Sequence, residues 1–453
     1  MHVAVSQAPK NPSGDAGNAS IFPRGYMLTF LLTTLIFFVW GMSNNLTDIL
    51  GQQFRKSFEL NVLQAQLVQT AVFLAYFVMA IPAALLMRKF GYKMGLVVGL
   101  VTFAIGTLMF WPAAVIGQYT PFLIALFIVG SGSSVLETAA NPLIAQFGDP
   151  ATSERRLNFS QAFNPPGTIA GVLFGTWFIF SGIEKNPTEI ASMKAQGTYA
   201  AYLHGEILRV VPTYVVLGIA VLVLAICIGR AKFPAGIDSS EGAGEIAPVR
   251  RGAYGRLLGN RNLMWAVAAQ FFYVGAQIST WSSLIFYLKA YTSLSEKASG
   301  YFLTGTLVAL ALGRIVSTPL MKFISPVKMI GLYAVLNILL LGVGIVHPGI
   351  VGASAILFTS FFMSIMFPTI FALGIKGLGD DTKLGGSFLV MAILGGAIFP
   401  PLLGLIARRT GSLALGYLLP VAGYVFVALY AFMVPKLGRE VDPDAVQAVP
   451  QNF

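Results

Sequence analysis

The feature that most constrains this chain is a series of uninterrupted apolar blocks, each of about 20 residues or more, separated by short polar segments. Such a block is long enough to cross a hydrocarbon core roughly 30 Å thick as an α-helix, and too long for a strand of a membrane barrel. Only 10% of the 453 residues are charged, against about 25% in soluble domains, so a soluble globular protein is excluded. We expect an all-α polytopic membrane protein.

The apolar blocks predict twelve transmembrane helices. They are expected at 26–50, 64–87, 94–112, 121–146, 157–181, 208–229, 262–289, 298–320, 327–346, 349–375, 384–407 and 412–434. A hydrophilic stretch at 182–207 joins the fifth and sixth spans. The longest hydrophilic connection divides the spans into six and six, which gives an N-terminal tail (1–25), an N-terminal half (26–229), a central loop (230–261), a C-terminal half (262–435) and a C-terminal tail (436–453).

The net charge of +11 is explained by membrane topology. The lysines and arginines lie between the apolar blocks and not on one face, so we expect no nucleic-acid partner. With the N-terminus inside the cell, 19 of them lie on the cytoplasmic side and 9 outside. Basic residues accumulate in cytoplasmic loops, so both termini are predicted to be cytoplasmic.

Two pairs of segments repeat weakly between the halves. Residues 86–95 resemble 320–331, and residues 141–149 resemble 367–381, each pair about 230 residues apart. An even number of spans separates the members of each pair, so the halves run in the same direction. Two parallel six-helix halves around a central cavity resemble the fold of the major facilitator superfamily.

Two of the eighteen acidic residues, Asp48 and Glu137, fall inside predicted spans. A charge at the bilayer centre costs about 2.5–3.5 kcal/mol on insertion scales, so a functional site is the first interpretation. The alternative is a structural acid that hydrogen bonds to a neighbouring helix. A buried carboxyl group without a cationic partner is harder to ionise, which makes both residues candidate proton carriers.

Polar side chains follow these acids at helical spacing. Each set falls on one helix face or close to it: Trp40, Asn44, Asn45 and Asp48 in the first span; Glu137 and Asn141 in the fourth; Gln161 and Asn164 in the fifth, ahead of Pro165-Pro166 where the helix must bend or break; Gln270, Tyr273 and Gln277 in the seventh, one turn before Trp281.

This combination suits a neutral sugar. Carboxylates and amides hydrogen bond to hydroxyls, and an indole covers the apolar face of a pyranose. No lysine or arginine inside the spans is placed to neutralise the acids, which argues against anionic substrates. One cysteine (Cys227) and three widely spaced histidines predict neither a disulfide nor a metal site.

At these residues the sequence resembles the fucose–galactose–glucose:proton symporter family of the major facilitator superfamily. The resemblance runs from about Tyr26 to Pro435. It is carried by NNLTDIL (44–50), LETAANP (136–142), RLNFSQAFN (156–164), AQFFYVGAQ (269–277) and FPTIFALGIKGLGDDTK (367–383).

The resemblance implies sugar–proton symport by alternating access. It links Asp48 to proton coupling and Glu137 to sugar binding and its coupling to the proton. It also places Trp40, Gln161 and Asn164 at the cavity, together with Asn44 and Asn45. Phe367 stands where the fucose-transporting members have a tyrosine, and Pro165-Pro166 also departs from their pattern, so the sugar itself stays open.

We therefore predict a monomeric secondary active transporter that imports L-fucose, glucose, galactose or a similar hexose across a bacterial inner membrane, with a proton as coupling ion and no cofactor. A sodium-coupled or uncoupled carrier of the same fold is the first alternative. A sugar sensor that does not transport is the second, although the short tails offer no signalling extension. An enzyme is not expected, because neither a set of metal ligands nor a nucleophile–base pair is present.

Overall fold

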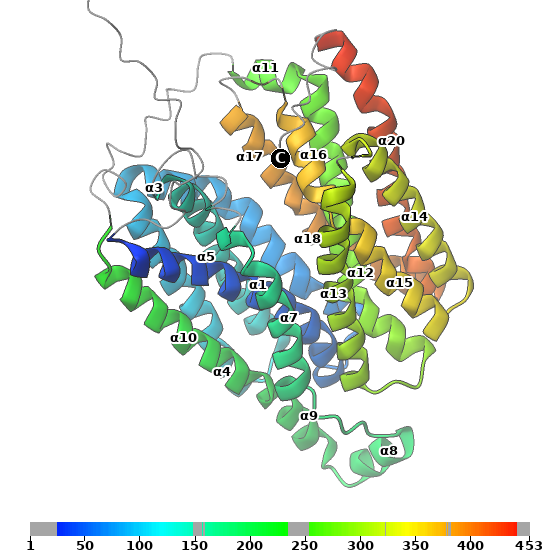
Figure 1. Cartoon of the computed structure of the whole chain (residues 1–453). Coiled ribbons are helices and arrows are strands. Elements are labelled where there is room, and N and C mark those ends of the chain that lie inside the picture. The colour runs from blue at the N-terminus through cyan, green and yellow to red at the C-terminus, as the bar shows by residue number, and fades with distance from the viewer. Residues whose placement is uncertain are drawn as a thin grey trace, which may run out of the picture.

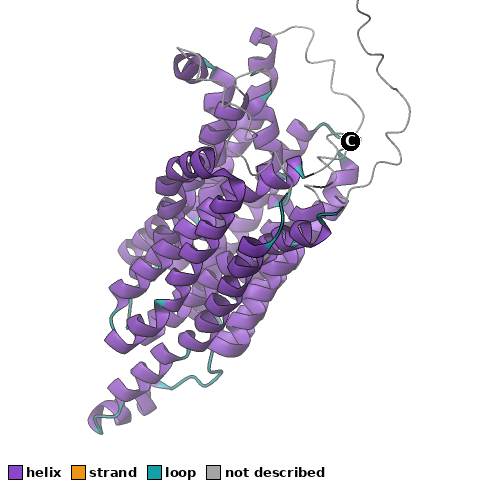
Figure 2. Ribbon diagram, turned by 90° about the vertical axis from the view of Figure 1, so that its left-hand side faces the viewer, coloured by secondary structure: helices purple, strands orange, loops and turns teal. Residues whose placement is uncertain are grey.

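The computed structural model describes residues 25–147, 156, 159–233, 253–321, 323–376, 378 and 382–441. These residues are almost entirely helical and contain no strand (Figure 2). Most of both tails and of the central loop lies outside them, so the predicted boundaries there are untested.

The helices form two bundles. The N-terminal half contains α1 (Met27–Ser57), α2 (Val62–Ala65), α3 (Leu67–Leu108), α4 (Phe110–Ile116), α5 (Tyr119–Gln146), α7 (Asn164–Phe174), the π-helix η2 (Gly175–Ile179), α8 (Pro187–Ala195), α9 (Tyr199–Leu208) and α10 (Val210–Arg230). The C-terminal half contains α11 (Ala253–Gly259), α12 (Arg261–Tyr291), α13 (Glu296–Leu320), α14 (Pro326–Val346), α15 (Ile350–Met363), α16 (Met366–Ile375), α17 (Thr382–Met391), the 3-10 helix η4 (Ala392–Leu394), α18 (Gly395–Thr410), α19 (Leu413–Gly416) and α20 (Leu418–Val441). Figure 1 shows the first half in blue to green and the second in light green to red, side by side.

The described helices account for the twelve predicted spans. Ten helical segments are long and apolar enough to cross a membrane, and the other two spans correspond to α7 with η2 and to α12. The outer surface is apolar: Val216, Ile315 and Phe432 are 67%, 68% and 68% exposed. Large aliphatic and aromatic side chains at this exposure indicate a surface that faces lipid. The all-α membrane fold with two six-helix halves is confirmed.

Several span boundaries differ from the prediction. The second and third spans follow each other directly in α3 and are separated by a kink at Gly91, which takes φ 80°, a conformation that a side chain disfavours. The fifth span is broken: residues 159–161 are helical, residues 162–163 form a turn, and Pro165 and Pro166 lie in the first turn of a new helix that begins at Asn164. Proline is tolerated in the first turn, where its missing N–H would have no partner, so the predicted break is confirmed. The hydrophilic stretch at 182–207 contains two short helices, α8 and α9.

The two halves meet at one end of the molecule. We call it the α8–α9 end, and call the opposite end, where α11 and the end of α20 lie, the α11 end (Figure 1). The last turns of α1 reach α12 and α13 there, α7 packs on α13, and α18 packs on α2 and α3. Gln66 Nε2 donates to Ser283 Oγ at 2.7 Å, and Thr70 Oγ1 donates to the Ala397 carbonyl at 2.8 Å. The polar contacts that link described residues of the two halves lie at this end or near the middle, so the α8–α9 end is closed.

Candidate functional site

Close packing of α7 on α1 positions the amides of the fifth span. Gly167 and Gly171 lie four residues apart, and a Cβ at either would collide with the carbonyl of Phe38 or Met42 on α1. Small residues at this spacing let two membrane helices approach closely. Asn164, one turn earlier, then lies beside α1, and its Nδ2 donates to the Phe37 carbonyl at 3.2 Å. The site is therefore built on two helices in direct backbone contact.

Asp48 lies inside the N-terminal half and not on an open surface. Its side chain is 6% exposed, and Oδ1 accepts a hydrogen bond from Gln69 Nε2 of α3 at 2.7 Å. The Gln69 amide oxygen in turn accepts from Thr47 Oγ1 at 3.4 Å. The bond to Asp48 is the shorter of the two, because Thr47 Oγ1 also donates to the Asn44 carbonyl at 2.5 Å, and it places the amide NH₂ group against the carboxyl group. No ion pair reaches Asp48 in the described part of the chain.

Glu137 differs from Asp48 in its surroundings. Its side chain is partly exposed, and among the described residues no protein donor reaches its carboxyl group. The neighbouring Asn141 donates to the Glu137 backbone carbonyl at 3.1 Å, and Gln161 Nε2 donates to Asn141 Oδ1 at 3.0 Å. These bonds tie α5 to the fifth span and leave the Glu137 carboxyl group available to a ligand.

An aromatic pair lies beside Glu137. Trp40 Nε1 donates a hydrogen bond to the hydroxyl of Tyr76 on α3. Ser134, three residues before Glu137 on α5, donates through its Oγ to the backbone carbonyl of Tyr76 at 3.4 Å, so Tyr76 lies against the turn of α5 that carries Glu137. Trp40 and Asn44 are half-buried, whereas Asn45 is 8% exposed and donates to the Gly41 carbonyl of its own helix at 3.3 Å. Trp40, Tyr76 and Glu137 therefore form one cluster, whereas the only hydrogen bond of the Asn45 side chain to a described residue is within α1.

The residues predicted in the C-terminal half form a separate group. The Tyr273 hydroxyl donates to the Met363 carbonyl at 3.1 Å, and its ring lies 6.5 Å from that of Phe367 in a T-shaped arrangement. Gln277 is partly exposed. Gln270 is fully buried, and neither atom of its amide has a partner within the described chain. In this conformation Gln270 is not accessible to a sugar.

The two groups do not meet. The hydrogen bonds of Trp40, Asp48, Asn141 and Asn164 remain within the N-terminal half, and no bond between described residues joins them to Tyr273 or its neighbours. The described residues also contain no group of three or more side chains suited to a metal ion. The arrangement offers a carboxyl group, an indole and amides on one side and aromatic rings on the other.

Two residues of this site were missed by the sequence analysis. Gln69 and Tyr76 lie seven residues apart on α3, which puts them on one face of that helix. An amide and a tyrosine within a predicted span were the available signal. Both contact residues of the first span, and such a contact depends on the packing of α3 against α1 and not on local spacing.

Comparison with known proteins then identifies the family. The sequence model of the Major Facilitator Superfamily matches residues 29–383. The chain belongs to the major facilitator superfamily.

Individual members of the superfamily are also similar to the chain. It is 38% identical to the L-fucose-proton symporter of Escherichia coli (strain K12) over 92% of its length and 94% of the relative's. It is 35% identical to the glucose/galactose transporter of Brucella abortus over 91% of its length and 95% of that relative's. Together with the superfamily match, these similarities confirm the resemblance drawn from the sequence motifs.

A solved structure shares the fold. A superfamily transporter, FucP, solved in the outward conformation, superimposes with a TM-score of 0.67 at 38% identity, covering 91% of this chain and 99% of that one. A fucose:proton symporter of E. coli gives a TM-score of 0.66.

Proposed function

We propose that this superfamily member carries a neutral monosaccharide together with a proton by alternating access. The observation that carries the proposal is that the two intramembrane acids differ in their hydrogen-bond partners and in their accessibility. Glu137 presents a carboxyl group without a protein donor beside Trp40 and Tyr76, whereas Asp48 is enclosed with Gln69. One acid is placed to bind sugar and the other to hold a proton away from it.

The roles follow from the chemistry of each group. An ionised Glu137 accepts hydrogen bonds from sugar hydroxyls, and the Trp40 indole covers the apolar face of the ring. Amides at Asn44, Asn164 and Gln161 add donors and acceptors. Among the described residues, no lysine or arginine forms an ion pair with Glu137. The site therefore offers no cationic side chain there to balance the charge of an anionic substrate. A neutral hexose suits the site, in agreement with relatives named for fucose, glucose and galactose.

The orientation of the protein in the membrane follows from the distribution of basic residues along the sequence. The predicted loops on the side of the termini hold 19 lysines and arginines and those on the other side hold 9, which supports a cytoplasmic location for both termini. The closed α8–α9 end then faces outward, and the site in this conformation faces the cytoplasm. A relative solved in the outward conformation represents the opposite state of the same cycle. We further propose a bacterial inner membrane, a monomer and no catalytic activity.

Purified protein in liposomes tests this proposal. A pH-sensitive dye outside the vesicles, without an imposed gradient, reports proton movement as L-fucose, D-glucose, D-galactose, D-mannose or N-acetylglucosamine is added. We expect alkalinisation outside with one of these sugars, lost in Glu137→Gln and kept in Glu189→Gln, whose side chain lies on the exposed helix α8. Labelled sugar that equilibrates without proton movement would indicate sodium-coupled or uncoupled transport. Absence of any sugar movement would refute the proposed function.

A further inference from the structure

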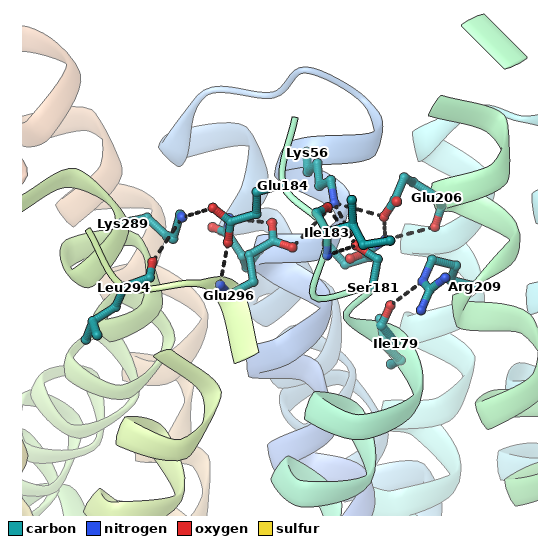
Figure 3. A network of polar contacts seen from close by, with 12 residues as sticks. Lys56, Ile179, Ser181, Ile183, Glu184, Glu206, Arg209, Lys289, Leu294 and Glu296 are labelled. Atoms are coloured by element: carbon teal, nitrogen blue, oxygen red, sulfur yellow. Dashed lines mark hydrogen bonds and ion pairs between the residues drawn. The ribbon is translucent and has the colours of Figure 1, made fainter. Parts of the chain in front are cut away.

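A group of charged side chains at the α8–α9 end joins the two halves of the protein (Figure 3). Its centre is Lys56 in the last turn of α1. Lys56 Nζ lies 3.0 Å from Glu206 Oε2 of α9, in the same half, and 3.4 Å from Glu296 Oε2 of α13, in the other half. One lysine therefore has two acidic partners, only one of which moves with it when the halves separate.

The two glutamates are held by consecutive residues of α1. Gln53 Nε2 donates to Glu206 Oε2 at 3.0 Å, whereas Gln52 Nε2 donates to Glu296 Oε1 at 3.4 Å. Both acids are buried, at 5% and 3% exposure. Neighbouring helical residues point about 100° apart, which explains why α1 reaches a different half with each amide. Lys56 lies three and four residues further on and fills the space between the acids.

A second link joins the halves beside the first. Glu184, in the segment between η2 and α8, forms an ion pair with Lys289 of α12 and accepts a hydrogen bond from the backbone N–H of Glu296. Figure 3 shows Glu184 between Lys289 and Glu296, facing the C-terminal half. The start of α13 is thus bound to two elements of the N-terminal half.

We propose that Lys56, Glu206 and Glu296 form a latch that sets the balance between the closed and open states of the α8–α9 end. The inference rests on alternating access, as in the proposed function, but concerns a separate site. Closure gives Lys56 its second partner, Glu296. Opening breaks that pair, yet Lys56 keeps Glu206, so the lysine is never left without a counter-charge. Glu206 therefore lowers the free-energy cost of opening, and Glu296 stabilises the closed state.

This division of roles predicts opposite effects for two equivalent substitutions. Glu296→Gln removes the partner present only in the closed state and favours opening. Glu206→Gln makes Glu296 the sole acidic partner of Lys56 and removes the repulsion between the two acids, so it favours closure. Lys56→Gln leaves both acids buried without a cation in the closed state and favours opening most strongly.

The experiment measures the distance between spin labels on the two halves by double electron–electron resonance. Labels at Gln118→Cys and Thr410→Cys, both exposed at this end, are introduced into a Cys227→Ser background. We expect Glu296→Gln to raise the ratio of open to closed molecules about fivefold or more, which corresponds to roughly 1 kcal/mol. Glu206→Gln should be at least as closed as wild type. Lys194→Gln is the matched control, because its pair with Glu59 is exposed and lies within one half.

The outcomes separate the latch from a packing effect. If Glu206→Gln opens this end as much as Glu296→Gln does, or if neither changes the distance distribution, the latch is refuted. Should Lys56→Gln not fold, the two glutamine variants still decide the question. The measurement uses no sugar or proton gradient, so its result does not depend on whether the chain carries a sugar.

Discussion

The hydrogen bond from Trp40 to Tyr76 allows a direct test of how the sugar site is organised. Tyr76→Phe removes only the hydroxyl that accepts from the Trp40 indole N–H. A hydrogen bond between neutral groups contributes about 0.5–1.5 kcal/mol net. Trp40 is half-buried, so water can replace the lost partner and the full penalty for an unpaired buried donor does not apply. If sugar binding requires the indole in its present orientation, affinity should fall about 2- to 12-fold.

Isothermal titration calorimetry of purified protein with L-fucose, D-glucose and D-galactose measures this change. A double-mutant cycle with Trp40→Phe shows whether Tyr76 acts through the indole. In that case Tyr76→Phe should have no further effect once Trp40 is replaced. Tyr333→Phe is the matched control, since its buried hydroxyl bonds to Ser317 Oγ at 2.8 Å between α13 and α14.

Two results would refute the reasoning. Additive losses from Trp40→Phe and Tyr76→Phe would mean that the hydroxyl acts independently of the indole. An equal loss in Tyr333→Phe would mean that any deleted buried hydroxyl weakens binding through the fold and not through this site.

The remaining predictions concern coupling, packing and one exposed helix. Asp48→Asn should still equilibrate labelled sugar across liposomes but move no protons with it; unchanged proton movement would remove Asp48 from coupling. Gly171→Val should destabilise the α1–α7 contact by about 1–3 kcal/mol and lower the temperature of unfolding in detergent, whereas Gly342→Ala, with open space around it, should not. A hydrogen bond from the Asn186 backbone N–H holds the pKa of Glu189 below its usual 4.5. Ionised Glu189 therefore stabilises α8 at neutral pH, and this contribution is lost as the pH falls below about 4.5 and through the lowered pKa. The protection factors of the amides in 187–195, which are exchange rates corrected for their intrinsic pH dependence, should decrease over this pH range, and unchanged protection would contradict this.

The positions of the two acids could be predicted from the sequence, but the different surroundings of Asp48 and Glu137 could not. A charge in a long apolar block is costly wherever the helix packs, so Asp48 and Glu137 are recognisable from the sequence. The residues that surround these acids are not recognisable from the sequence, because Gln69 and Tyr76 belong to another helix. The burial of Gln270 and of Asn45 likewise depends on neighbouring helices, whose positions are not defined by local residue spacing.

The sequence by itself determined the twelve spans, the two halves, the helix break at Pro165-Pro166 and the stripe of Trp40, Asn44 and Asp48. Each depends on apolar length, proline geometry or helical period, which are local properties. Only the tertiary structure decided which end is closed and what Lys56 binds. Its two partners are 150 and 240 residues away in the chain. Ion pairs over such separations exist only when one particular arrangement of the halves brings the charges together.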